Sequence, residues 1–331
     1  MNERTTMSGK PVFTVPAKSV INFQSKFGAK LLCDGMTFTA GDSCTMSCSF
    51  CFVEAMQKKR VKWFEDHGVT GDHFDHVIRR ENAVEIARKQ IMSKPKSFRQ
   101  KKQVIYGSPL VDVCGNQELM RETVEICKVI LELTNWDIRL LSKSNLLPKV
   151  AKALEEWDSK QPMNETHATG CRVIYGVSTG TLDDELAAAF EQGTAKVSKR
   201  IESLHWLQDN GFRTFGMICP SLPQDDYVDF AWSMSKALRD EKCEHVWAEV
   251  INLRGESFTR TEKALLDAGF RRKATQLSDV SHGGSDWENY ARDTFRSLSV
   301  PFAGKLRFLQ YVTKDTRAWW EAQKQNGAIP L

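Results

Sequence analysis

The sequence contains no long hydrophobic run. No apolar stretch approaches the roughly 20 residues of a membrane-spanning helix, and the polar start MNERTTMSGKP lacks the apolar core of a signal peptide. Internal repeats and low-complexity tracts are also missing. We therefore expect a cytoplasmic protein with no membrane partner. In that reducing compartment, cysteines bind metal, react or fill the core.

Charge of one sign is not in large excess. The 331 residues contain 46 Lys and Arg against 42 Asp and Glu, a net charge of +4, which permits a nucleic-acid partner without requiring one. The basic residues cluster at 58–62, 94–102 and 271–273. Solvated faces usually explain such runs, although Phe98 within the second run suits base stacking.

Three of the nine cysteines lie within eight positions, in the segment GDSCTMSCSFCF, and no fourth cysteine lies nearby. Thiolates spaced C-x3-C-x2-C on one loop can reach three irons of a cubane cluster, whereas a [4Fe–4S] cluster is commonly held by four cysteines. One iron would then stay open to another ligand. The three residues are Cys44, Cys48 and Cys51.

Two other interpretations of these cysteines remain open. Zinc would require a fourth Cys or His, and the nearest candidates lie more than fifteen residues beyond Cys51: His67, His73 and His76. The three cysteines could also be unrelated core or surface thiols.

Short β-rich runs alternate with longer helical patterns such as 116–133 and 198–211. This alternation predicts an α/β fold with a parallel sheet, as an open sheet or a barrel. Chemistry in such folds lies on loops at the C-terminal strand ends, and the three cysteines directly follow the first predicted strand. The predicted strands are 36–40, 103–107, 136–142, 171–178, 212–220 and 245–252.

The cysteine motif, with aromatic Phe50 before the last cysteine, resembles that of the radical S-adenosylmethionine superfamily. The resemblance implies a partial (β/α)6 TIM-like barrel and a [4Fe–4S] cluster on Cys44, Cys48 and Cys51. It also implies S-adenosyl-L-methionine on the open iron, cleaved to a 5′-deoxyadenosyl radical. An external one-electron reductant such as flavodoxin or ferredoxin would supply the electron.

Three further segments, 138–154, 173–191 and 189–223, are similar in order to spore photoproduct lyase and its relatives. The similarity runs from about residue 35 to 225. We expect an N-terminal arm at 1–34, the barrel at 35–254 and a helical C-terminal extension, or cap, at 255–331.

The resemblance also implies residue roles. Ser142, Lys143 and Ser178 would line the S-adenosylmethionine site, where Lys143 can pair with the methionine carboxylate. Arg200 is a second candidate for that carboxylate. The remaining candidates are Tyr106, Gly107 and Ser108 near the methionine amine, and Glu249 and Asn252 near the adenine or the substrate.

The sequence departs from the lyase pattern beside the third cysteine. Phe50 and Phe52 stand where the lyase has tyrosines, and Ser108 and Pro109 lie near its hydrogen-donor position. Cys114 is the displaced candidate donor, or else a small buried hydrophobe. Without a donor, hydrogen could return directly from 5′-deoxyadenosine, as in an isomerase.

We therefore expect a radical enzyme that abstracts hydrogen from a modified or damaged thymine-type nucleotide in DNA. The outcome would be rearrangement in base hypermodification, or C–C cleavage in lesion repair through Cys114. RNA or peptide is an alternative substrate, and a zinc-containing nucleic-acid-binding protein is the non-catalytic alternative. An extruded base would need phosphate contacts, for which Arg271, Arg272 and Lys273 are candidates.

Overall fold

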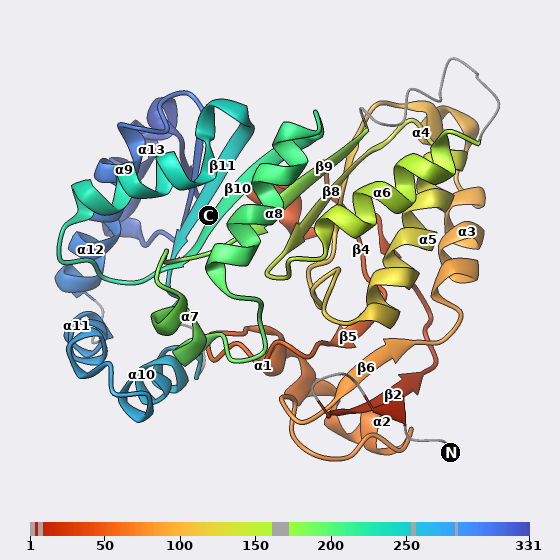
Figure 1. The fold of residues 1–331 in the computed structure, drawn as a ribbon, viewed down its shortest axis with the longest axis horizontal. Helices are drawn as coiled ribbons and strands as arrows, with labels where there is room; N and C mark the ends of the chain where they lie inside the picture. Colours follow the sequence, from red (N-terminus) through yellow and green to blue (C-terminus); the bar gives the residue numbers. More distant parts are fainter. Residues whose placement is uncertain (1–3, 6–8, 161–171, 253–255, 282–283) are drawn as a thin grey trace. The chain divides into compact units, whose positions relative to one another are not determined.

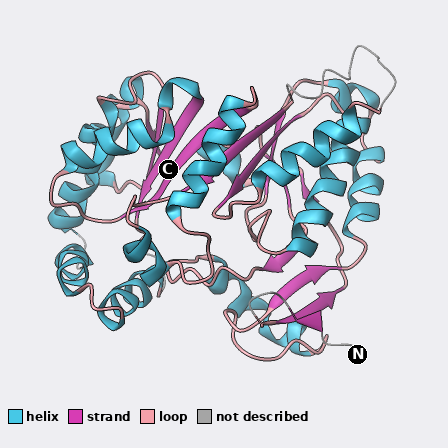
Figure 2. Ribbon diagram, viewed as in Figure 1, coloured by secondary structure: helices cyan, strands magenta, loops and turns pink. Residues whose placement is uncertain are grey.

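The computed structural model describes residues 4–5, 9–160, 172–252, 256–281 and 284–331. Helices and strands alternate through most of the chain (Figure 2). The chain forms two compact units: Met1–Ser47, Val53–Gly176 and Trp206–Arg213 make the first, and Cys48–Phe52, Val177–His205 and Thr214–Leu331 make the second. The cysteine segment is thus divided, with Cys44 in the first unit and the other two in the second.

The first unit contains a mostly parallel sheet (Figure 1). Strands β4 (Met36–Phe38), β7 (Val104–Gly107) and β8 (Asp137–Ser142) run parallel, and β9 (Val173–Ser178) follows in the strand order. The short β3 (Ile21–Asn22) pairs antiparallel with β4 at the edge. Helix α5 (Gln117–Leu133) packs against α3 (Ala83–Met92) and α6 (Leu147–Asp158).

Helix α5 shows why the local sequence folds as it does. Asn116 caps its N-terminus by accepting a hydrogen bond from the Leu119 backbone N–H at 2.7 Å, which satisfies a donor that the first turn leaves unpaired. Leu119, Ile126 and Ile130 recur at helical spacing and are fully buried. The cap lies in the loop after β7, so it also fixes that loop.

The first unit contains a second, smaller sheet, which the sequence did not predict. Its strand order is β1 (Arg4–Thr5), β2 (Pro11–Val15), β6 (Val77–Arg80) and β5 (Gly41–Ser43). Val15 and Ile78 pack with Phe64 and Val69 beneath it. Helix α1 (Val53–Gln57), the 3₁₀ turn η2 (Lys58–Arg60) and helix α2 (Val61–Glu65) follow the cysteine segment.

The second unit contains parallel strands β10 (Arg213–Ser221), β11 (Cys243–Val250), β12 (Leu306–Gln310) and β13 (Ala328–Pro330). Two helices flank Glu191 in the sequence: α7 (Asp184–Phe190) and α8 (Val197–Asp209). The remaining helices are α9 (Tyr227–Leu238), α10 (Ser257–Asp267), α11 (Arg271–Ser281), α12 (Gly284–Ser299) and α13 (Lys314–Ala322).

All six predicted strands are present with closely similar bounds; the first residue of the fourth prediction, Cys171, lies outside the described residues. The α/β class with a parallel sheet is therefore confirmed. In the strand order of the described residues β3 and β13 are edges, so no closed barrel forms. The extension at 255–331 is not purely helical, because it also contains β12 and β13.

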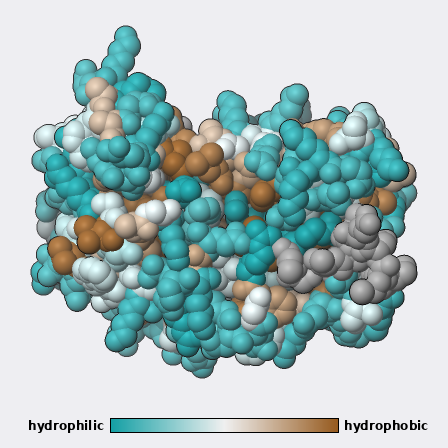
Figure 3. Space-filling model, turned by 90° about the horizontal axis from the view of Figure 1, so that it is seen from above, coloured by the Kyte–Doolittle hydropathy of each residue, from teal (hydrophilic) through white to brown (hydrophobic). Residues whose placement is uncertain are grey.

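Sequence reasoning did not predict strand β12, the run LRFLQ, because it lies within the segment expected to be helical. Its Phe308 ring is buried and stacks on Trp320 of α13 at 5.6 Å between centroids. No helix in the described ranges is long and apolar enough to cross a membrane. Hydrophilic side chains cover most of the face in Figure 3, and hydrophobic residues gather there in small groups.

Candidate active site

Cys44 lies against the loop that follows β7. Sequence reasoning placed the cysteines directly after the first strand, but the short strand β5 intervenes and ends at Ser43. The Thr45 hydroxyl donates a hydrogen bond to the Gly115 carbonyl. A Cβ atom at Gly115 would lie 3.1 Å from the Cβ atom of Cys44, so only glycine leaves ample room beside this half-buried cysteine.

Asp112 organises the same loop. Its carboxylate accepts hydrogen bonds from the Ser142 hydroxyl at 2.6 Å, the Lys143 backbone N–H at 2.7 Å and the Cys114 backbone N–H at 2.8 Å. Burial raises the pKa of Asp112, and these hydrogen bonds oppose the rise. Asp112 thus joins the β7 loop to the C-terminal end of β8. Sequence reasoning missed it, although an acidic residue just past a predicted strand was a usable signal.

Replacing Asp112 with asparagine should lower the free energy of unfolding by about 1–3 kcal/mol, because an amide N–H₂ would face the Lys143 N–H. The loss should grow as the pH falls toward 4. A raised folded pKa means that folding favours the protonated carboxyl, so wild-type stability falls as the pH rises from the ordinary pKa to the raised one. Urea unfolding of both proteins between pH 4 and 8 measures this. A pH-independent difference would contradict it.

Cys114 lies behind this carboxylate and is only 2% exposed. Burial raises the pKa of its thiol well above the usual value, the Asp112 charge raises it further, and a hydrogen bond with Ser142 acts in the opposite direction. The thiol therefore keeps its hydrogen at neutral pH. A reactive thiolate would need the opposite environment.

The end of β7 packs closely on β4. The buried Tyr106 ring stacks on Phe27 with centroids 5.8 Å apart. A Cβ atom at Gly107 would lie 2.3 Å from the Phe38 ring, so no larger residue fits there. The Ser108 hydroxyl donates to the Thr39 hydroxyl at 2.7 Å. A role for these three positions in ligand binding stays a prediction.

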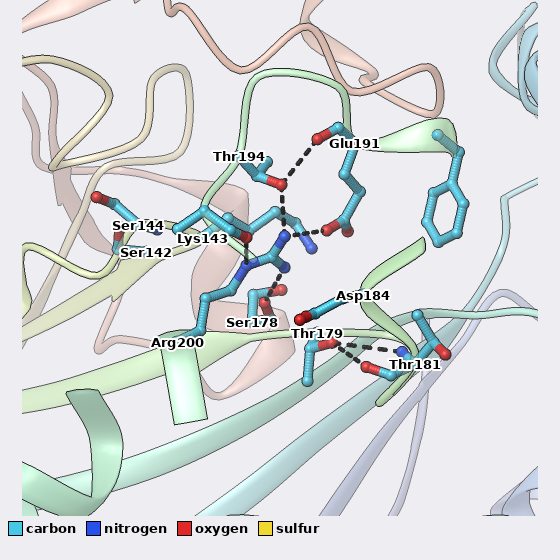
Figure 4. Close-up of polar contacts among 12 residues, drawn as sticks. Ser142, Lys143, Ser144, Ser178, Thr179, Thr181, Asp184, Glu191, Thr194 and Arg200 are labelled. Carbon is cyan, nitrogen blue, oxygen red and sulfur yellow. Dashed lines mark hydrogen bonds and ion pairs between the residues drawn. The ribbon is translucent and has the colours of Figure 1, made fainter. Parts of the chain in front are cut away.

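Arg200 is completely buried, contrary to the usual expectation for a lone helix arginine. Figure 4 shows its guanidinium ion-paired with Glu191 at 2.6 Å, with side-chain exposures of 0% and 1%. It also donates to the carbonyls of Ala195 at 2.8 Å and Ser178 at 2.9 Å, and to the Thr194 hydroxyl. These contacts favour a positioning role over direct contact with a ligand carboxylate.

Cys48 and the residue after it are held by the C-terminal end of α7. Cys48 forms an isolated antiparallel bridge with Glu191, and the Ser49 backbone N–H donates to the Phe190 carbonyl at 2.9 Å. The Phe50 ring packs 5.8 Å from the Phe190 ring. Glu191 therefore joins the backbone of the second cysteine to Arg200, which in turn holds the end of β9.

Arg260 of α10 holds the other side of this loop. Its guanidinium donates to the Ser49 carbonyl at 2.9 Å and to the Cys51 carbonyl at 3.1 Å. Sequence reasoning missed Arg260, and nothing local to its helix marked it. Two carbonyls on one guanidinium fix the turn that presents Cys51.

The strand ends of the second unit are tied together by Tyr290. Its buried hydroxyl donates to the Ser221 carbonyl and accepts from the Ile251 backbone N–H at 3.3 Å. Ser178 donates to the Cys219 carbonyl at 3.2 Å. Glu249 and Asn252 are half-buried at the C-terminal end of β11. Tyr290 was not predicted, because its partners are backbone atoms far away in sequence.

Two of the basic clusters are engaged by the protein itself. Phe98 packs edge-on against Phe23 and Trp136, so its ring is part of the packing at the N-terminal end of β8. Arg272 donates to Asp225 at 2.5 Å, and Lys273 lies 3.8 Å from the same carboxylate. Arg271 is exposed.

The donor set suits an iron–sulfur cluster chemically. It consists of Cys44, Cys48 and Cys51, and soft thiolates are the ligands such clusters prefer. Within the described part of the chain, no three His, Cys, Asp or Glu side chains are gathered closely enough to hold a metal ion. The assembly of these thiols around a cluster therefore stays a prediction. His67 and His76, considered as zinc ligands, each place a ring nitrogen on a backbone carbonyl.

Comparison with known proteins identifies the fold. No family model matches the sequence, and no curated protein matches it either. Among solved structures the chain is similar to spore photoproduct lyase complexed with dinucleoside spore photoproduct, and to a mutant of that lyase with bound AdoMet and the same dinucleoside. In both cases the TM-score is 0.59 at 12% identity, covering 91% of this chain and 82% of the other. The chain therefore has the fold of spore photoproduct lyase.

Proposed function

We propose that this protein is a radical S-adenosylmethionine enzyme that abstracts hydrogen from a modified or damaged thymine-type nucleotide in DNA. One observation carries the proposal: a chain with the fold of spore photoproduct lyase contains three cysteines spaced C-x3-C-x2-C. The substrate class follows from the dinucleoside spore photoproduct bound to that lyase. The parallel sheet would form the partial barrel of such enzymes.

The residues would divide the work as follows. Cys44, Cys48 and Cys51 would hold a [4Fe–4S] cluster, whose bound S-adenosylmethionine supplies a radical hydrogen abstractor on reduction by an external donor. Lys143 would pair with the methionine carboxylate. The protein's main task is then to hold the target carbon in place and exclude quenchers. The remaining contacts would come from Ser142 and Ser178, from 106–108, and from Glu249 and Asn252.

Rearrangement and C–C cleavage differ in how the hydrogen returns. Phe50 and Phe52 carry no O–H group, and Phe50 packs on Phe190, so neither can relay hydrogen. Direct return from 5′-deoxyadenosine would make the enzyme an isomerase. The second candidate, a repair lyase, is favoured by the protonated Cys114 thiol beside Ser142, because a thiol S–H can give a hydrogen atom to a carbon radical and be left as a thiyl radical.

Isotope transfer tests the proposal. In D₂O, an oligonucleotide containing spore photoproduct should gain one deuterium per product if the Cys114 thiol is the donor, since that thiol exchanges with solvent. A substrate labelled at the abstracted position should transfer its deuterium to 5′-deoxyadenosine, and in the isomerase that label should return to the product. Mass spectrometry of nucleosides and 5′-deoxyadenosine distinguishes the routes. Absence of label in 5′-deoxyadenosine with any thymine-type oligonucleotide would overturn the substrate class.

Cys114→Ala and Cys127→Ala form a matched pair, because both thiols are buried and only Cys114 lies beside Asp112 and Ser142. The first variant should lose solvent deuterium from the product and the second should retain it. Equal labelling in the two variants would remove Cys114 from the reaction. A colourless protein with stoichiometric zinc would instead support the non-catalytic alternative.

A further inference from the structure

A basic groove in the first unit is not used by the proposed chemistry. Its volume is about 670 Å³, and it lies where the segment after β2 meets η2 and α2. Five basic side chains line it against two acidic ones, Asp42 and Asp66. The basic residues are Lys18, Lys59, Arg60, Lys62 and Arg80.

The floor of the groove is held rigidly by Asp42, whose side chain is 2% exposed. The Arg80 guanidinium donates to this carboxylate from Nε at 3.1 Å and from Nη2 at 2.8 Å. Its Nη1 donates to the Ser19 carbonyl at 2.9 Å. Arg60 donates to the same carboxylate at 3.1 Å. Two guanidinium groups on one carboxylate leave a fixed positive charge at the floor.

The rim adds charge that is exposed to solvent. The Arg60 side chain is 43% exposed. Its guanidinium, a planar fork of N–H donors, lies 4.7 Å from the Trp63 ring centroid, and this contact orients it. His67 lies 4.3 Å from the same ring, so Trp63 supports Arg60 instead of offering a free stacking face. The rim lysines Lys18, Lys59 and Lys62 are exposed.

We propose that this groove binds the phosphodiester backbone of the nucleic-acid substrate, outside the reacting nucleotide. A preorganised arginine fork with exposed lysines around it suits phosphate oxygens, and such contacts position a strand without reading its sequence. Asp42 lies in β5, two residues before Cys44. Contacts between this groove and the DNA phosphates would offset part of the free-energy cost of extruding a base. This inference rests on the proposed function.

Binding of a fluorescein-labelled DNA 12-mer, followed by anisotropy from 50 to 300 mM KCl, tests the groove. The triple variant Lys18→Gln, Lys59→Gln and Lys62→Gln should bind about tenfold more weakly or worse, with the slope of log K against log salt reduced by about 2. A control with equal charge loss in the same unit, Lys96→Gln, Lys101→Gln and Lys149→Gln, should keep the wild-type slope. All six lysines are exposed.

Arg60→Lys supplies a second variant that keeps the charge but loses the planar fork. It should weaken binding by about 3–10-fold with little change in slope. If the wild type binds DNA but the groove and control triples lose equal affinity, the groove assignment fails while the proposed substrate class stands. If the wild type binds no oligonucleotide at any salt concentration, both fail. If the groove variants lose affinity for inorganic phosphate and for DNA by equal factors, the result would support recognition of phosphate oxygens by this groove.

Discussion

Alanine at Cys44, Cys48 or Cys51 should each lower the rate of reductive cleavage of S-adenosylmethionine at least about 100-fold, because each removes one of the three proposed thiolate ligands. Anaerobically purified wild type should be brown, with close to four irons and four sulfides per chain. Each variant should contain markedly less iron. Iron and sulfide analysis, visible absorbance and 5′-deoxyadenosine formation measure these effects.

Cys243→Ala provides the control, since this buried cysteine lies in β11 and belongs to none of the proposed ligand positions. It should keep iron content and cleavage near the wild-type level, with only the small stability loss of a trimmed core side chain. A wild type that binds no iron, or a Cys51 variant with a full cluster and full cleavage, would overturn the assignment.

Glu191→Gln should lower the free energy of unfolding by about 3–5 kcal/mol, because it leaves the buried Arg200 charge without its counterion. Glu191 also bridges the backbone of Cys48, so the same variant should lose cluster more readily on exposure to a chelator. Urea unfolding and the rate of iron loss to the chelator measure the two effects.

Two further variants separate the charge from the packing. Arg200→Met combined with Glu191→Leu removes both charges at similar volume and should recover part of the lost stability. The recovery is partial because the Ala195 and Ser178 carbonyls lose their donor. Glu185→Gln, on the exposed face of the same helix α7, should change stability by less than about 0.5 kcal/mol. A loss below about 1 kcal/mol for Glu191→Gln would show that the ion pair is not a major support of this loop.

The sequence alone determined the class of the fold and the position of its strands. Runs such as 173–178 are buried over their whole length, and β-branched and apolar residues between helical patterns mark such strands directly. The smaller sheet was missed because its strands are two to five residues long and its central pair, β2 and β6, joins Val12 to Val77 across 65 positions. Nothing local encodes such pairing.

The candidate site also has one part that the sequence predicted and another that only the tertiary structure revealed. The spacing of Cys44, Cys48 and Cys51 is a property of the chain, so the sequence alone gave rise to the proposed donor set. Asp112, Glu191 and Arg260 each contact at least one segment 30 or more positions away. A buried charge is not distinguishable from a solvated one without its surroundings. Only the tertiary structure decided that Arg200 is a buried counterion and not a surface residue. The physical reason is that burial and hydrogen-bond partners are set by packing between segments, which residue order does not record.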